Sequence, residues 1–455
     1  MLRYALGCAV LVALVALAPA AAVRAGEATP AGTLTLREAL AMAAADGDAV
    51  IAARLEAAAA YERGEAAAAD RFWPKAELST DYSRSDDPAV TTNFRVQQNK
   101  LMKLGRFDAQ NHRTRAGLSY VVFDGGESAG RQRSALAGFS AAMRGSESVR
   151  SRAVVAAGNA FLAAVYSERQ LAVARAEVGR MESRLDNVRV QEKAGRATAA
   201  DVLQAEYRLE RARRDALVAG NAVTTCRETL GRLLGRDGRV GEQLAEGPDS
   251  PLAGADLPSG PESAEQYALA ASPELARARA ELAGREAELD ERRATRWPRI
   301  EAQASTYWDD DSFGRLDDNQ RSYLFGVGLT WTAFDGGLRR ARILEARHLA
   351  EAAEVREREA ERLARTGARE AARALEEARA GAAVAARKVA ADEAAFQQTE
   401  KAHDAGRATF TELLAAQTEV ADSRLAEIQA GFDARRAELR LLEATGFWAS
   451  WNPSR

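Results

Sequence analysis

Residues that could do chemistry are sparse in this sequence. The three histidines, His112, His348 and His403, lie far apart and lack the spacing of metal ligands. The acidic run at 309–311 lacks the glycine and the ligand spacing of a calcium loop, so it is typical of a solvated loop. The sequence contains no phosphate-binding loop, dinucleotide fingerprint or nucleophile elbow. We therefore expect no enzyme, no cofactor and no metal site.

Two short motifs each occur twice at one spacing. Phe-Asp-Gly-Gly contains Asp124 and again Asp335, and Gly-Arg-Ala-Thr begins at Gly195 and again at Gly406. In both copies 71 positions separate the aspartate from the later glycine. This spacing predicts a duplicated unit of fixed length.

The motif residues are suited to chain reversals. An aspartate can cap a helix, and paired glycines permit a sharp turn from a strand into that helix. Gly195 and Gly406 can end helices in the left-handed conformation at two hairpin tips. The predicted strand-to-helix turns comprise Asp124, Gly125, Gly126, Asp335, Gly336 and Gly337.

The segments between the motifs predict rods. No proline occurs between Pro88 and Pro248 or between Pro298 and Pro453, and Ala, Glu, Arg and Leu are abundant there. At 1.5 Å per residue such a segment forms a helix of roughly 100 Å. Apolar residues at steps of three and four predict a close antiparallel coiled coil; in the first rod they are Leu171, Ala174, Val178, Met181, Leu185 and Val188.

Each half also predicts a helix, at about 36–71 and 263–293, that ends at a Trp-Pro pair. Alternating runs of about 10 residues follow each pair and precede each Phe-Asp-Gly-Gly, with polar loops expected at 84–115 and 309–320. Such runs suit tilted membrane strands or a sheet with one wet face. We expect Phe325, Val327 and Leu329 to face lipid, and Thr330 and Thr332 to face a lumen.

The amino terminus predicts export. Residues 1–25 combine Arg3, an apolar run too short for a membrane span and small residues suited to cleavage. Cys8 could suggest a lipid anchor, but the apolar run continues past it. Removal of this segment takes the net charge from −3 to −5, which gives no sign of nucleic-acid binding, and leaves Cys226 without a disulfide partner.

Four strands cannot close around a pore, and open sheet edges are not tolerated in lipid. Several copies of the 455-residue chain must therefore share one barrel. Three copies would supply about 12 strands, which lies within the range of known barrels.

The motifs, in order and twice, resemble the TolC-like outer-membrane efflux proteins over nearly the whole mature chain. The Gly-Arg-Ala-Thr tips are followed by Ala-Ala-Asp-Val-Leu-Gln-Ala-Glu and Phe-Thr-Glu-Leu-Leu-Ala-Ala-Gln. This resemblance implies a homotrimer with a 12-stranded barrel in outer-membrane lipid and a long α-helical tunnel in the periplasm. It also implies a passive duct that docks on a periplasmic adaptor (a membrane fusion protein) and an inner-membrane transporter.

The resemblance assigns the pore entrance to Asp201 and Glu412, each six residues beyond a tip glycine. In a trimer they would form a ring of six carboxylates that attracts cations; alternatively, they are surface charges or partners of arginines. The family often has a second acid and an aromatic near the second tip, where this chain has Ala415 and His403. We expect the adaptor to meet the tips, which contain Gly195, Arg196, Gly406 and Arg407, unless these glycines merely end helices.

The predicted fold class is therefore an α+β membrane protein with two structural repeats. Residues 1–25 form the signal, 26–235 the first repeat, 236–262 a linker, 263–445 the second repeat and 446–455 a tail on the outside of the rods. The expected function is the channel of a tripartite efflux or type I secretion system. The alternative is a trimeric cell-surface coiled-coil structural protein, which would have no need of strands with aromatic apolar faces.

Overall fold

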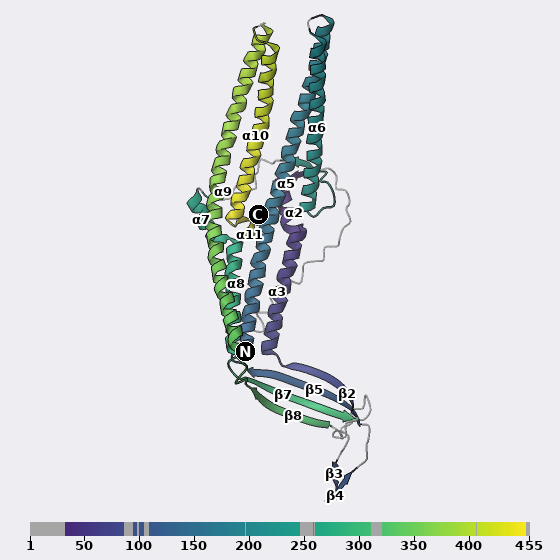
Figure 1. The fold of residues 1–455 in the computed structure, drawn as a ribbon, viewed down its shortest axis with the longest axis vertical. Helices are drawn as coiled ribbons and strands as arrows, with labels where there is room; N and C mark the ends of the chain where they lie inside the picture. The colour runs from purple at the N-terminus through teal and green to yellow at the C-terminus, as the bar shows by residue number, and fades with distance from the viewer. Residues whose placement is uncertain are drawn as a thin grey trace.

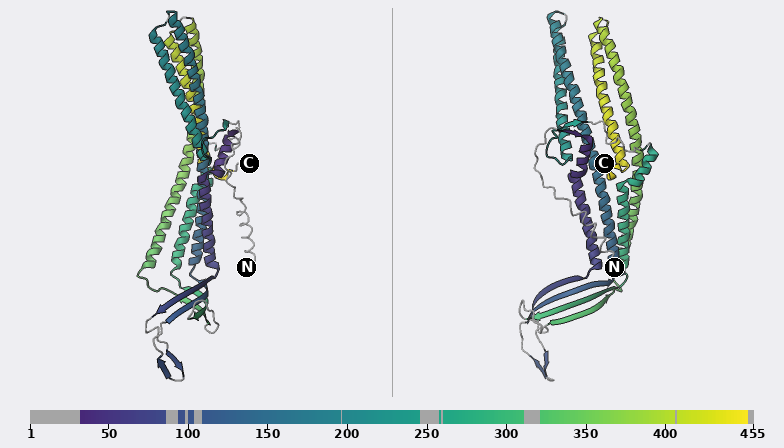
Figure 2. Two further views of the ribbon diagram at one scale, coloured as in Figure 1. Left: turned by 90° about the vertical axis from the view of Figure 1, so that its right-hand side faces the viewer. Right: turned by 180° about the vertical axis from the view of Figure 1, so that it is seen from behind.

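The computed structural model describes residues 32–85, 94–97, 100–103, 109–195, 197–245, 258, 260–310, 321–405 and 407–451. The predicted signal at 1–25 and linker residues 246–257 lie outside the described residues. Long helices run from a small sheet at one end of the molecule to the tips of two helical hairpins at the other end (Figures 1 and 2).

Two helical hairpins form the rods. Helices α5 (Glu127–Lys193) and α9 (Leu338–Asp404) have 67 residues each, and α6 (Ala199–Leu233) and α10 (Phe410–Ala444) have 35 each. At the helical rise, α5 and α9 are each roughly 100 Å long. Helix α6 folds back along the far part of α5, and α10 does the same along α9 (Figure 1).

The predicted coiled-coil seam of the first hairpin is observed. Met181 and Leu185 of α5 form a buried cluster with Leu209 and Ala212 of α6. At its side the guanidinium of Arg213 lies 2.9 Å from the carboxylate of Glu182. The same ion pair recurs 211 positions later, where Arg424 lies 2.6 Å from Glu393.

Four shorter helices lie between the sheet and the middle of the molecule: α2 (Leu36–Asp46), α3 (Asp48–Phe72), α7 (Pro261–Ala271) and α8 (Pro273–Ala294). The prediction of one unbroken helix in each half was therefore wrong. The breaks fall at Gly47 and Ser272, which both have extended backbone conformations. Ser272 precedes a proline, which disfavours the helical conformation, and its hydroxyl caps α8. Glycine likewise favours a helix end at Gly47.

The sheet contains four antiparallel strands in the order β2, β5, β7, β8. Their bounds are Lys75–Ser85, Ala109–Phe123, Arg299–Asp310 and Arg321–Thr330. Within this described sheet β2 and β8 are the edge strands (Figure 1).

These strands correct three predictions. Strand β5 begins at Ala109 because its residues 109–119 pair with the whole of β2, so the loop expected at 84–115 is shorter. That region also contains a small hairpin, β3 (Phe94–Gln97) and β4 (Lys100–Lys103). Strand β7 continues to Asp310, so it includes the first two residues of the loop expected at 309–320. Strand β8 ends at Thr330. Thr332 therefore lies beyond the strand and faces no lumen from it.

The main core lies midway along the molecule, where both halves meet. Trp448 of α11 (Phe447–Ser450) is fully buried among Leu40, Leu162 and Leu439. Arg150 of α5 donates a hydrogen bond to the carbonyl oxygen of Trp451, with a distance of 2.6 Å. The tail thus enters the core instead of lying outside the rods, because its indole rings supply apolar volume between α2, α5 and α10. Nearby, β1 (Thr33–Thr35) pairs with β6 (Gln243–Ala245), a strand within the predicted linker.

Candidate functional site

The two hairpin tips lie at the end of the molecule farthest from the sheet (Figure 1). Gly195 has a φ of +70°, so it ends α5 in the left-handed conformation that glycine adopts without strain. At the second tip the backbone N–H groups of Arg407 and Ala408 both donate to the carbonyl oxygen of Ala402. Arg407 is exposed, whereas Arg196 and Gly406 lie outside the described residues.

Asp201 and Glu412 occupy matching places in the first turns of α6 and α10. Each is the third residue of its helix and belongs to a capping box with a preceding threonine. Oδ2 of Asp201 accepts hydrogen bonds from N and Oγ1 of Thr198 at 2.8 and 2.7 Å. Oε2 of Glu412 accepts the equivalent bonds from Thr409 at 2.7 and 2.9 Å. One oxygen of each acid is therefore engaged, and both side chains remain exposed.

These hydrogen bonds hold the acids in the ionised form. The backbone N–H of Thr198, and then its hydroxyl, lower the pKa of Asp201 below its ordinary value of 3.8. Thr409 lowers the pKa of Glu412 below 4.5 in the same way. Each tip thus carries one ionised carboxylate at neutral pH.

The capping role of Asp201 and Glu412 was not predicted from the sequence, although the sequence contains its signal. A threonine three positions before an acid, ahead of an apolar run, is typical of a capping box. A third box joins Thr35 and Glu38 at the start of α2, far from the tips. Capping therefore explains acids at these positions without any pore, and the role of Asp201 and Glu412 at an entrance stays a prediction.

The strand-to-helix turns have the same geometry in both halves. Gly125, Gly126, Gly336 and Gly337 all have φ between +66° and +94°. A β-carbon on Gly125 would lie 2.6 Å from the β-carbon of Trp297, so only glycine fits there.

The two aspartates were predicted at the cap position itself, but each lies two positions before it. The helices begin at Glu127 and Leu338, and the cap position falls on the second glycine of each turn. Asp124 accepts hydrogen bonds from the N–H groups of Gly126 and Ser128, and Asp335 from those of Gly337 and Arg339. Each carboxylate thus ties the turn to the first helical residues.

The sheet carries most of its large apolar side chains on one face. Strand pairing places Leu118, Ala304 and Phe325 in one row across β5, β7 and β8. Large exposed side chains on this face are Leu78, Tyr82, Leu118, Tyr120, Tyr323, Phe325, Val327 and Leu329. The opposite face is mainly polar, although the exposed Leu324 lies on it opposite Ser305. On this face Nη2 of Arg115 donates to Oγ of Ser305 at 3.2 Å. A sheet with so much exposed apolar surface needs an apolar environment.

The residues first considered for chemistry form no site in the described part of the chain. His348 lies 3.1 Å from Glu351 on the exposed surface of α9. The side chains of His112, His403, Asp309 and Asp310, and all of Asp311, lie outside the description. Among the described residues there is no cluster that could hold a metal ion and no helix apolar enough to cross a membrane.

The family model for outer membrane efflux proteins matches residues 39–236 and 265–447. The chain belongs to the outer membrane efflux protein family. The resemblance to TolC-like channels seen in the sequence is therefore confirmed. This efflux protein is a channel of the outer membrane with a periplasmic helical extension, and it is no enzyme.

Solved structures share the fold of this efflux protein. A membrane protein from Pseudomonas aeruginosa has a TM-score of 0.77 and 22% identity, with 90% of each chain covered. CusC has a TM-score of 0.78 and 17% identity, covering 93% of this chain and 94% of that one. The Campylobacter jejuni CmeC outer membrane channel has a TM-score of 0.77 and 14% identity, covering 92% and 87%. No curated protein matches the chain.

Proposed function

We propose that three copies of the chain close one 12-stranded barrel in the outer membrane, and that their rods continue the pore through the periplasm. The observation that carries this proposal is the four-stranded sheet, which has an exposed apolar face and two edge strands, β2 and β8. In lipid, unpaired backbone groups along such edges would each cost several kcal/mol. Three chains with four strands each remove every edge.

The proposed channel is passive, and it serves a tripartite efflux or type I secretion system. No catalytic or nucleotide-binding constellation accompanies the sheet and rods in the sequence. Energy must therefore come from an inner-membrane transporter, joined through a periplasmic adaptor. The adaptor meets the hairpin tips, where the sequence places Gly195, Arg196, Gly406 and Arg407, because the α5–α6 and α9–α10 hairpins extend farthest from the sheet.

The proposed entrance lies at the same end. Three copies would bring Asp201 and Glu412 into a ring of six carboxylates. Crowded negative charges attract cations and repel anions, as acidic rings do in cation channels.

Two measurements on the purified protein test this function. Native mass spectrometry in detergent should give three chains, and planar bilayers should show discrete single-channel conductance. A monodisperse monomer that still inserts into bilayers would contradict the shared barrel. A trimer without conductance would favour a structural cell-surface protein instead.

A further inference from the structure

The two strand hairpins have the same register. In β2–β5, Leu78 lies opposite Ala116, and in β7–β8, Ala302 lies opposite Val327. The second pair stands 224 and 211 positions after the first. The next pair obeys the same two offsets, since Ala76 opposite Leu118 becomes Ile300 opposite Leu329. The halves can therefore be matched residue by residue through the sheet.

The junction between the two hairpins is also recorded within the chain. There β5 pairs with β7, so that Leu118 lies opposite Ala304 and Ala116 lies opposite Thr306. By the residue matching above, β5 corresponds to β8 and β7 corresponds to β2. A pairing equivalent to that of β5 with β7 would therefore join β8 to β2, which are the two edge strands. One chain cannot join these edges to each other across the sheet that separates them.

We infer that β8 of one copy pairs with β2 of the next in the register of β5 and β7. The two offsets then place Leu329 opposite Thr80 of the next copy, and Val327 opposite Tyr82 of that copy. This inference rests on the proposed trimeric barrel and names the residues that join its subunits.

The register is supported by the faces of the two edge strands. Val327, Leu329, Leu78 and Tyr82 are all exposed. In the inferred register they fall on one face, so the apolar band continues across the junction. A slip by one residue would place Glu77 on that face, among lipid chains.

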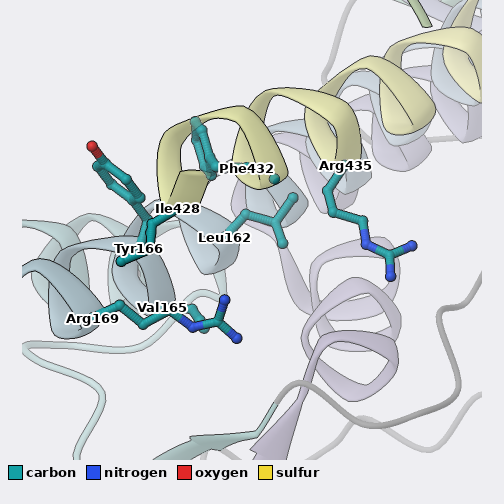
Figure 3. Close-up of a pocket in the computed structure, with 8 residues that line it drawn as sticks. Leu162, Val165, Tyr166, Arg169, Ile428, Phe432 and Arg435 are labelled. Atoms are coloured by element: carbon teal, nitrogen blue, oxygen red, sulfur yellow. The ribbon is translucent and has the colours of Figure 1, made fainter. Parts of the chain in front are cut away.

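The helices provide an independent match. Within one chain α10 packs against α5, and Figure 3 shows the contact around a cavity of about 220 Å³. The rings of Tyr166 and Phe432 lie 5.4 Å apart, and Leu162 and Leu439 share a buried cluster nearby. Adding 211 to a position on α5 gives the equivalent position on α9, and subtracting 211 from a position on α10 gives the equivalent position on α6. Helices α9 and α6 lie on opposite flanks of the molecule (Figure 1).

At the transferred positions polar and charged residues replace these apolar ones: Tyr166 and Phe432 correspond to Glu377 and Asn221, and the two leucines correspond to a pair of opposite charges. Leu162 corresponds to Arg373 on α9, and Leu439 corresponds to Glu228 on α6. Both charged residues are exposed in the single chain. Their opposite charges fit a junction between copies, whose surfaces meet water before assembly, whereas the junction within the chain is buried during folding.

Cysteine cross-linking in the full-length protein tests the register. With Cys226→Ser as background, Leu329→Cys is combined with Thr80→Cys, and Val327→Cys with Tyr82→Cys. The two pairs lie two positions apart on one face of an antiparallel sheet, so they share one separation between opposite residues, and the second pair repeats the test of the first. Leu329→Cys with Ala76→Cys is the control, since Ala76 lies about 13 Å farther along the strand. Oxidation should give covalent dimers and trimers for at least one matched pair and none for the control.

The outcomes separate this inference from the proposed function. A conducting trimer in which neither matched pair cross-links, or in which the control cross-links better, overturns the register alone. A protein that stays monomeric overturns both. Charge reversal adds a second test: Arg373→Glu or Glu228→Arg should lower the temperature at which the trimer dissociates, and the double reversal should restore it. Equal stability of all four proteins would overturn the helix contact.

Discussion

At the scale of single residues, Asp201 and Glu412 combine a local role with a proposed one. Each caps its own helix through a threonine, which fixes the carboxylate at the start of the returning helix. The same fixation holds one charge from each hairpin at the same height above its tip. Capping therefore positions the charges that the proposed entrance would use. Different substitutions are needed to separate the capping role of these acids from their role as charges at the entrance.

Removing the charges should change ion selectivity. Asp201→Asn with Glu412→Gln keeps the size of both side chains and leaves an oxygen that can accept the capping bonds. We expect cation-over-anion selectivity in bilayers to fall, and block by multivalent cations from the tip side to weaken. Glu38→Gln alters the third capping box, far from the tips, and should leave selectivity unchanged. Unchanged reversal potentials in the double variant would mean that these acids do not line the entrance.

Removing the caps should change the pH dependence of selectivity. Hydrogen bonds from Thr198 and Thr409 lower the pKa of the two acids, so the charge is present at higher pH and is lost as the pH falls through those lowered values. Thr198→Ala with Thr409→Ala should move the midpoint of selectivity loss to higher pH. The matched Thr→Ser pair retains the hydroxyls and should behave as wild type. Identical midpoints for both pairs would separate the caps from the titration.

Arg407 offers a test of docking that leaves the backbone intact. Gly195 has positive φ, so its substitution would strain the turn and confuse docking with stability. Arg407 is exposed, and Arg407→Glu should block export through loss of the adaptor while trimer yield and melting stay normal. Arg356→Glu, at an exposed position far along α9, is the control. Normal export from the tip variant would argue against this docking point.

At the scale of elements, the sheet has two chemically different faces, and its pairing assigns every strand residue to one of them. Val327 is 73% exposed and lies on the apolar face, opposite Ala302. Gln303 lies one position along β7 and therefore on the polar face. Because Thr330 is the last residue of β8, Gln303 gives a better comparison at the same depth.

An arginine on the two faces should have opposite consequences. Val327→Arg places a charge among lipid chains and should cost about 2–4 kcal/mol, which would reduce assembly in the outer membrane. Gln303→Arg places it in the lumen and should be tolerated. The measurement is the amount of heat-stable trimer in outer-membrane fractions. Equal tolerance of both substitutions would mean that the apolar face does not meet lipid.

Sequence patterns anticipated these elements to different degrees. The rods and seam were predictable because proline is missing over long stretches and apolar residues such as Met181 and Leu185 repeat at helical steps. The breaks at Gly47 and Ser272 had local signals, since aspartates flank the glycine and a proline follows the serine, but they were missed because long alanine-rich runs lie on both sides. The start of β5 at Ala109 was missed because its polar residues are paired by β2, a contact that no local pattern records. At the tips, spacing located both acids, but the capping bonds emerged only from the geometry.

At the scale of the whole molecule, the tail holds the two halves together. Trp448 is fully buried between helices of both halves, and its indole nitrogen donates to the carbonyl oxygen of Leu439 at 3.4 Å. Trp448→Ala should destabilise the protein by about 3–5 kcal/mol through loss of this buried volume. Thermal melting in detergent measures the effect, with the exposed Leu55→Ala on α3 as control. Comparable melting of both variants would show that the tail is dispensable.

The equal lengths of the hairpins restrict how such a channel can change its reach. Each half contains a 67-residue helix and a 35-residue partner. An insertion in one helix alone would shift its seam against the partner, and an insertion in one hairpin alone would leave its tip out of level with the other. Insertions that lengthen the rods must therefore occur in all four helices together and in whole heptads, each of which adds about 10 Å. The distance that the duct can span is thus quantised, and natural variants should differ in length by such steps.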